Sequence, residues 1–124
     1  MRHDKYLKNK RGETMAMHWI RHICDEPPVW MRHGNNVLNR YGETMAMYWI
    51  CWIEDDVPEW IRHHKNLQDK FGRTLAMHWI DCRRSNPPEW MHHDPVIKTK
   101  NNETVIEIWS KCISSEAPEW MKIK

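Results

Sequence analysis

Histidine and cysteine residues occur in this sequence at spacings that could bring metal ligands together. His18 and His22 are four residues apart, as are His78 and Cys82, and an i, i+4 pair presents two ligands on one helix face. Cys112 could add a second thiolate. The segment from His18 to His22 has the spacing of a zinc-protease helix but lacks the glutamate that would act as the base. We favour the simpler interpretation that these are polar surface residues of helices, and we predict no metal and no other cofactor.

Motifs for nucleophilic or nucleotide-dependent catalysis do not occur in the sequence. It contains no G-x-S-x-G motif, no P-loop and no glycine-rich dinucleotide fingerprint, and it has only four glycines. Cysteines with nearby histidines are present, but small stacked repeats offer no deep pocket that would tune a thiol. The sequence therefore predicts a protein that is not an enzyme.

A repeat of 30 residues organises the whole chain. Eight of the nine tryptophans follow this spacing, as do one threonine and one proline in every copy, whereas Trp52 does not. The repeated residues are Trp19, Trp49, Trp79 and Trp109; Trp30, Trp60, Trp90 and Trp120; Thr14, Thr44, Thr74 and Thr104; Pro28, Pro58, Pro88 and Pro118. Self-similarity at about 20–50 residues is typical of stacked supersecondary units. We predict a single repeat domain, 1–124, with copies 1–30, 31–60, 61–90 and 91–120, of which the terminal copies act as caps.

The composition is that of a globular chain with nearly balanced charge. Hydrophobic residues make up 40% and charged residues 29%, and 19 basic residues face 17 acidic ones. This balance gives no electrostatic reason to expect nucleic acid or an anionic membrane surface as a partner. No apolar run is long enough to cross a membrane, and the N-terminal residues contain no hydrophobic signal segment. We expect a soluble, cytoplasmic protein whose four cysteines are reduced thiols.

Each copy is predicted to contain a turn, a helix, a second turn and a short second helix. The positive φ of the first turn is supplied by Gly12, Gly42, Gly72 and Asn102. The repeated threonine then stands at a helix N-cap, and Thr104 with Glu107 has the pattern of a capping box. The repeated proline opens the second helix. Histidines recur near the end of that helix and are expected to cap its terminal carbonyls: His3, His33, His63 and His93.

The turn and the start of the first helix resemble the opening of an ankyrin repeat. The strings Asn9-Lys-Arg-Gly12-Glu-Thr14, Asn39-Arg-Tyr-Gly42-Glu-Thr44 and Asp69-Lys-Phe-Gly72-Arg-Thr74 look like the D-x-x-G-x-T of that family. The period is close to the family's period of about 33 residues. The family's T-P-L-H appears in altered form, as in Thr14-Met-Ala-Met17. The resemblance implies an all-α, curved ankyrin-like solenoid of about four turn-helix-turn-helix repeats with short β-turn hairpins.

The resemblance also implies where a partner would bind. In ankyrin-like repeats the turn tips and the exposed side of the first helix line a concave face that binds proteins. Carried over by position, this face contains Arg11, Arg21, His22, Arg40, Tyr41, Trp52, Lys70, Phe71, Arg73 and Asp81. Tyr41, Trp52 and Phe71 are aromatic residues of the central copies close to arginines, a composition typical of interface hot spots. The alternative is that Tyr41 and Phe71 only pack on the neighbouring turn.

The sequence thus favours a small stand-alone module that binds a protein partner and blocks, inhibits or scaffolds it, for instance as a phage or pathogen inhibitor of a host system. One alternative is a metal-binding protein that uses the histidines and cysteines of the first helices. Another is a weak nucleic-acid binder that uses a basic ladder along the turns, although glutamates are interleaved with it: Lys10, Arg40, Lys70 and Lys100. A monomer and an end-stacked homodimer both remain open.

Overall fold

The computed structural model describes residues 8–33, 37–53, 55–63 and 65–123. In these ranges the chain forms helices and no β-strand, which confirms the predicted all-α class for this part of the chain. The chain divides into two compact units, Met1–His63 (unit 1) and His64–Lys124 (unit 2). Among the described residues, no helix combines the length and the apolar character needed to cross a membrane.

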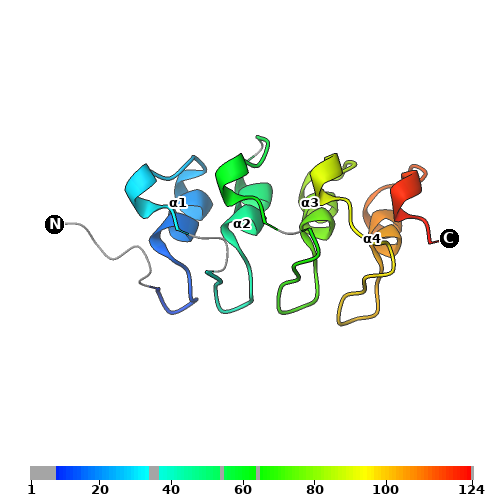
Figure 1. Ribbon diagram of the computed structural model, residues 1–124, viewed down its shortest axis with the longest axis horizontal. Helices are drawn as coiled ribbons and strands as arrows, with labels where there is room; N and C mark the ends of the chain where they lie inside the picture. The colour runs from blue at the N-terminus through cyan, green and yellow to red at the C-terminus, as the bar shows by residue number, and fades with distance from the viewer. Residues whose placement is uncertain (1–7, 34–36, 54, 64, 124) are drawn as a thin grey trace. The chain divides into compact units, whose positions relative to one another are not determined.

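Each unit contains two copies of the same local structure (Figure 1). Unit 1 consists of α1 (Met15–Ile23), the 3-10 helix η1 (Val29–Met31), α2 (Met45–Trp52) and η2 (Glu59–Ile61). Unit 2 consists of α3 (Leu75–Arg83), η3 (Glu89–Met91), α4 (Val105–Cys112) and η4 (Glu119–Met121). The second helix of each copy is therefore a three-residue 3-10 helix, and the repeated proline is its N-cap.

One side chain closes the turn at the start of each copy. Asn9 Oδ1 accepts hydrogen bonds from the backbone N–H groups of Arg11 and Glu13, at 2.9 and 3.0 Å. The equivalent side chains bond the backbone two and four residues ahead in the same way: Asn39, Asp69 and Thr99. This role explains why only Asn, Asp and Thr stand at this position, because each offers a short side-chain oxygen.

The histidines that follow η1, η2 and η3 have a role that the sequence did not predict. Nε2 of His33 lies 2.7 Å from the hydroxyl oxygen of Thr14. The same contact is 2.9 Å long between His63 and Thr44 and between His93 and Thr74. The threonine oxygens also accept the N–H of the third helical residue, as a predicted N-cap should. Each histidine therefore links one copy to the helix cap of the copy before it; His3 lies outside the described residues.

The last copy closes its helix cap without a histidine. The position after η4 that matches His93 is Ile123. Here Glu107 Oε1 accepts from the backbone N–H and from the hydroxyl of Thr104, at 3.2 and 3.1 Å. The predicted contact between Thr104 and Glu107 is thereby confirmed.

Within each unit the two α-helices pack on each other, α1 on α2 and α3 on α4. In unit 2 the side chains of Met77 and Ile80 in α3 form a buried cluster with Val105 and Trp109 of α4 and Met121 of η4. Helices of eight or nine residues are marginal in water by themselves. Their stability must therefore come from contacts of this kind between copies.

The buried His93 predicts a loss of stability in mildly acidic solution. Its Nδ1 lies 2.9 Å from the carbonyl oxygen of Asp94 and so donates, which leaves Nε2 to accept from the Thr74 hydroxyl. Burial lowers the pKa of His93 below 6.5 despite the opposing effect of Asp94. The unfolded chain then binds the proton more readily than the folded chain. The His93 contribution to the free energy of unfolding should be complete above pH 6.5 and decrease as the pH falls below it.

This dependence can be measured by urea unfolding between about pH 7.5 and 5.5, together with an NMR titration of the His93 ring. The variant His93→Gln should show a smaller decrease over that range, because its side chain does not titrate. A ring pKa at or above 6.5 would contradict the prediction.

Candidate functional site

Residues predicted for the concave face of the first two copies meet around one groove in unit 1. This groove, which we call groove 1, has a volume of about 250 Å³ and is lined by residues of both turns and both α-helices. Four of the predicted residues line it: Arg11, Arg21, Tyr41 and Trp52. The remaining lining residues are Glu13, Glu43, Met47, Tyr48 and Cys51.

A buried carboxylate, that of Glu13, lines groove 1, and 2% of the residue's surface is exposed. Nε and Nη2 of Arg21 donate to its two oxygens at 2.8 and 2.9 Å. Asn9 Nδ2 donates at 2.9 Å. The hydroxyl of Tyr48, in the next copy, donates at 2.7 Å and itself accepts from Asn39 Nδ2 at 2.9 Å. This network joins the two copies and fixes the polar base of the groove.

The hydrogen bonds hold Glu13 and Tyr48 in one protonation state each. Burial raises the pKa of Glu13, but hydrogen bonds from Arg21, Asn9 and Tyr48, with the charge of Arg21, lower it overall from 4.5 to about 2. Burial and the hydrogen bond to Glu13 raise the pKa of Tyr48 above its usual range. Neither group exchanges a proton near neutral pH, which is what a general acid or base would have to do. The network is therefore a rigid support for the groove.

Two aromatic side chains, Tyr41 and Trp52, also line groove 1. Trp52, at the end of α2, is 48% exposed. Tyr41 is half-buried, and its hydroxyl accepts from Arg40 Nη2 at 2.6 Å while the Arg40 guanidinium lies 5.0 Å from the ring centroid. Arg40 thus orients Tyr41 at the turn tip without lining the groove itself.

A second groove, groove 2, occupies the same repeat positions in unit 2. It has a volume of about 260 Å³ and is lined by the predicted residues Phe71, Arg73 and Asp81. The Arg73 guanidinium lies 5.5 Å from the centroid of the Phe71 ring, which is half-exposed. Lys111 and Glu103 form an ion pair in the same groove. The other lining residues are Met77, Thr99, Asn101, Ile108 and Cys112.

The two grooves are lined by equivalent repeat positions of their units, but the side chains at these positions differ. Glu13 and Arg21 of groove 1 correspond to Arg73 and Asp81 of groove 2, so both charges change sign. The position of Trp52 is taken by Cys112. One local structure therefore presents two different sets of side chains.

The other predicted residues lie elsewhere. Lys70 is exposed at a turn tip and does not line groove 2. His22 lines a different hollow of unit 1, where its ring centroid is 4.2 Å from that of His18.

His78 is not the surface residue expected from the sequence, because it is 3% exposed and its Nε2 lies 2.9 Å from Asp69 Oδ2. Burial raises the pKa of Asp69, but the hydrogen bonds from His78 and from the Arg73 backbone, together with the charges of His78 and Arg73, lower it overall.

The residues named as alternative metal ligands lie in different surroundings. His18 and His22 are exposed and adjacent, and both could reach one ion from the same helix face. Cys82 is exposed, and Cys112 is half-buried with its Sγ 3.9 Å from Asp81 Oδ1. All four cysteines are present as thiols.

Sequence reasoning missed the contribution of Tyr48 to groove 1. Tyr48 binds Asn39 of its own copy, and His78 binds Asp69 in the same way, nine residues apart in both cases. The last copy has Thr99 and Ile108 at these positions. Where the turn residue is Asn or Asp, the residue nine positions later is a hydrogen-bonding Tyr or His, and where it is Thr99 the later residue is apolar. This paired variation was the signal in the sequence that could have revealed the hydrogen bond between the two positions.

Comparison with known proteins assigns this chain to no family. No protein-family model matches it, and no curated protein sequence matches it. The resemblance to ankyrin repeats therefore rests on the turn and helix motifs of the chain itself.

Proposed function

We propose that this protein is a non-enzymatic binding module that holds a protein partner against the concave face of an ankyrin-like stack of repeats. The observation that supports this function best is the convergence of Arg11, Arg21, Tyr41 and Trp52 on groove 1. These residues come from both copies of unit 1 and combine exposed aromatic area with arginine, which is the composition of interface hot spots.

The rigidity of the groove supports a binding role. The Glu13 carboxylate has four donors, so Arg21 and Tyr48 are already held in place before a partner arrives. A surface that is ordered in advance loses less conformational entropy on association. Trp52 and Tyr41 can then contribute their area at a low cost in side-chain ordering.

Each unit carries its own groove, and the two grooves differ in the side chains that they offer to a partner. Groove 1 presents Tyr41 and Trp52, whereas groove 2 presents Phe71 with an ion pair of Lys111 and Glu103. In this proposal binding itself is the activity: the protein blocks, inhibits or scaffolds its partner in the cytoplasm, as a phage or pathogen inhibitor of a host system would.

The proposal predicts that truncation of the groove aromatics weakens partner binding. A pull-down with the full chain, analysed by mass spectrometry, would identify the partner. The triple variant Tyr41→Ala, Trp52→Ala, Phe71→Ala should then bind it at least about 30-fold more weakly, because hot-spot truncation costs about 2 kcal/mol or more. Titration calorimetry with the purified partner measures the loss.

The control is Val29→Ala, which alters a side chain that is exposed in η1 and lines neither groove. It should bind the partner as the parent chain does. Circular dichroism must show that the triple variant keeps its helices. Unchanged affinity of a folded triple variant would exclude the grooves as the binding site.

A further inference from the structure

One positive charge in the lining of groove 1 has no partner within the described residues. The side chain of Arg11 is exposed at the turn tip of the first copy and lines the groove. It forms no hydrogen bond and no ion pair with any residue that the structure describes. The other arginine of the lining, Arg21, gives both Nε and Nη2 to the carboxylate of Glu13. Arg11 is therefore the guanidinium that groove 1 can offer to a partner.

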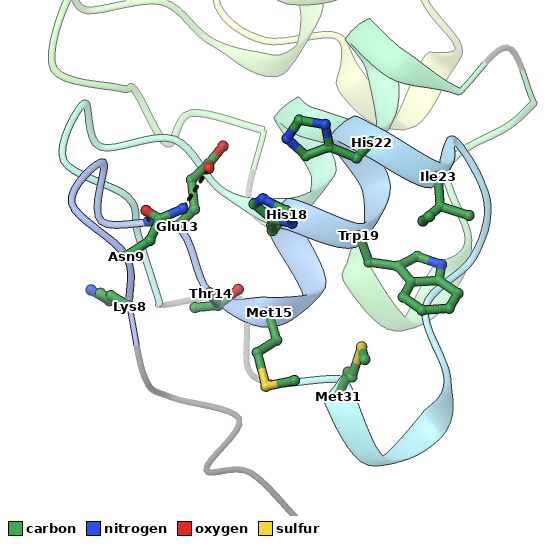
Figure 2. Close-up of a pocket in the computed structure, with 10 residues that line it drawn as sticks. All are labelled: Lys8, Asn9, Glu13, Thr14, Met15, His18, Trp19, His22, Ile23 and Met31. Atoms are coloured by element: carbon green, nitrogen blue, oxygen red, sulfur yellow. Dashed lines mark hydrogen bonds between the residues drawn. The ribbon is translucent and has the colours of Figure 1, made fainter.

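The carboxylates of the groove are bonded to other side chains. Glu13 accepts from Asn9 Nδ2 at 2.9 Å (Figure 2) and is neutralised by the arginine of α1. Glu43 is half-buried, and its Oε1 accepts from Asn39 Nδ2 at 2.8 Å. Since neither carboxylate is paired with Arg11, the donors of this guanidinium are available for a ligand.

Two further basic side chains lie at the same turn tips. Lys10 and Arg40 are exposed, and the backbone N–H of Arg40 donates to the carbonyl oxygen of Arg11 at 3.0 Å, so the two tips touch. The side chain of Arg40 is bonded to the hydroxyl of Tyr41, which carries no charge and leaves the positive charge in place. Against these three cations stands one carboxylate that no cation neutralises within unit 1, that of Glu43. The turn tips of unit 1 therefore have an excess of positive charge beside an aromatic groove.

Groove 2 does not offer a free cation of this kind. Its two cations are both paired, Arg73 with Asp69 at 3.4 Å and Lys111 with Glu103. The ring of Phe71 takes the repeat position that the free guanidinium has in groove 1. We therefore expect an anionic group of a partner to prefer groove 1 to groove 2.

An acidic side chain next to an apolar one would satisfy both parts of groove 1. The planar guanidinium of Arg11 can donate two parallel hydrogen bonds to one carboxylate. Trp52, which is 48% exposed, and Tyr41 line the same groove and can cover an apolar neighbour of that carboxylate. Removal of the apolar group from water and pairing of the charge then favour the same bound segment.

A nucleic-acid strand is the less suitable anion for this groove. Proteins that bind single strands use a channel that is positive along several nucleotides. Groove 1 has a volume of only about 250 Å³, and the carboxylate of Glu43 in its lining would repel successive phosphates. A single carboxylate needs only the contact with Arg11.

On the basis of the binding function proposed above, we propose that groove 1 recognises an acidic segment of the protein partner, in which Asp or Glu stands beside an apolar residue, and that Arg11 selects this segment.

The first test uses a defined probe, the peptide acetyl-Gly-Glu-Leu-Glu-Gly-amide, with acetyl-Gly-Lys-Leu-Lys-Gly-amide as its charge-reversed control. The full chain is titrated with each peptide, and the indole N–H of Trp52 is followed by NMR. The acidic peptide should bind with a dissociation constant on the order of 1 mM, as expected for one charged and one apolar contact. The basic peptide should leave the Trp52 signal unchanged.

Charge reversal in the chain makes the result specific to Arg11. Arg11→Glu should weaken binding of the acidic peptide at least about tenfold and should allow the basic peptide to bind. Lys100→Glu changes the net charge by the same amount at a turn tip of unit 2, where the exposed side chain lines neither groove. This control should bind the acidic peptide as the parent chain does.

The second test uses the partner obtained by pull-down and separates this proposal from the binding function itself. Arg11→Glu should weaken partner binding at least about tenfold, and added salt should reduce the difference from the parent chain. A partner that the aromatic triple variant no longer binds, but that Arg11→Glu binds as tightly as the parent chain does, would refute the acidic segment and leave the binding function in place. Unchanged binding of the triple variant would refute the binding function.

Three results of the peptide test would also overturn the proposal. One is no change in the Trp52 signal up to about 10 mM acidic peptide. Another is equal binding of the acidic and the basic peptide. The third is tighter binding of a single-stranded oligothymidylate of about ten nucleotides that Arg11→Glu abolishes, because the groove would then serve a nucleic acid.

Discussion

Replacement of Glu13 by alanine should lower the free energy of unfolding by about 3 kcal/mol, because removal of one partner leaves a buried polar network unpaired. Arg21 would lose both of its hydrogen bonds to the carboxylate, and the Tyr48 hydroxyl would lose its acceptor inside the protein. Urea unfolding of the full chain at neutral pH, followed by tryptophan fluorescence, measures the change.

Glu43→Ala is the matched control, since Glu43 has the same repeat position in the second copy. It is only half-buried and accepts from Asn39 Nδ2 at 2.8 Å, so its loss should cost about 1 kcal/mol. Acid titration gives an independent check. Because the pKa of Glu13 is lowered from 4.5 to about 2, its stabilisation is complete above pH 4.5 and is lost as the pH falls toward 2. Equal effects of the two alanine variants would show that the network does not stabilise unit 1.

Replacement of Gly12 by alanine should cost about 3 kcal/mol or more, for two separate reasons. Gly12 has a φ of +76°, which strains any residue with a Cβ. In addition, a Cβ at this position would lie 2.5 Å from the backbone nitrogen of Arg40. That nitrogen donates to the carbonyl of Arg11 at 3.0 Å, so the second turn would have to move and break the bond between the turns. Thermal and urea unfolding measure the cost.

The variant Asn102→Ala distinguishes the strain of a positive φ from the steric clash with the next turn. It occupies the same turn position in the last copy with a φ of +62°, and among the described residues no later turn follows it. Asn102→Ala should therefore show the strain of the positive φ alone, about 1 kcal/mol. Gly72→Ala should behave like Gly12→Ala, because its Cβ would lie 2.8 Å from the Lys100 nitrogen. If Gly12→Ala costs no more than Asn102→Ala, the close approach of the next turn does not require glycine.

Local signals in the sequence were enough to predict the α-helices. Each α-helix begins directly after the repeated threonine, at Met15, Met45, Leu75 and Val105. N-cap chemistry and helical periodicity act over a few residues, so they can be read from one copy. The tight turn before the helix is equally local, which is why Asn102 was recognised as the substitute for glycine.

Contacts between copies could not be predicted in this way. Glu13 and Tyr48 are 35 residues apart, and Thr14 and His33 are 19 residues apart. Neither pair follows from helical spacing, because each depends on how successive copies pack. Groove 1 was anticipated in part, since Arg11, Arg21, Tyr41 and Trp52 were selected by their repeat positions. The burial of His78 was missed because its partner, Asp69, was assigned only to the turn.

The hydrogen bonds that join the threonines of the first three copies to the following histidines also bear on how such a chain can gain or lose copies. A segment cut as 1–30 would contain Thr14 but not His33, the residue that binds it. Segments that end after His33, His63 or His93 instead keep every threonine with its histidine. The unit of exchange in recombination, or in an engineered array, is therefore offset by three residues from the repeat that the sequence suggests.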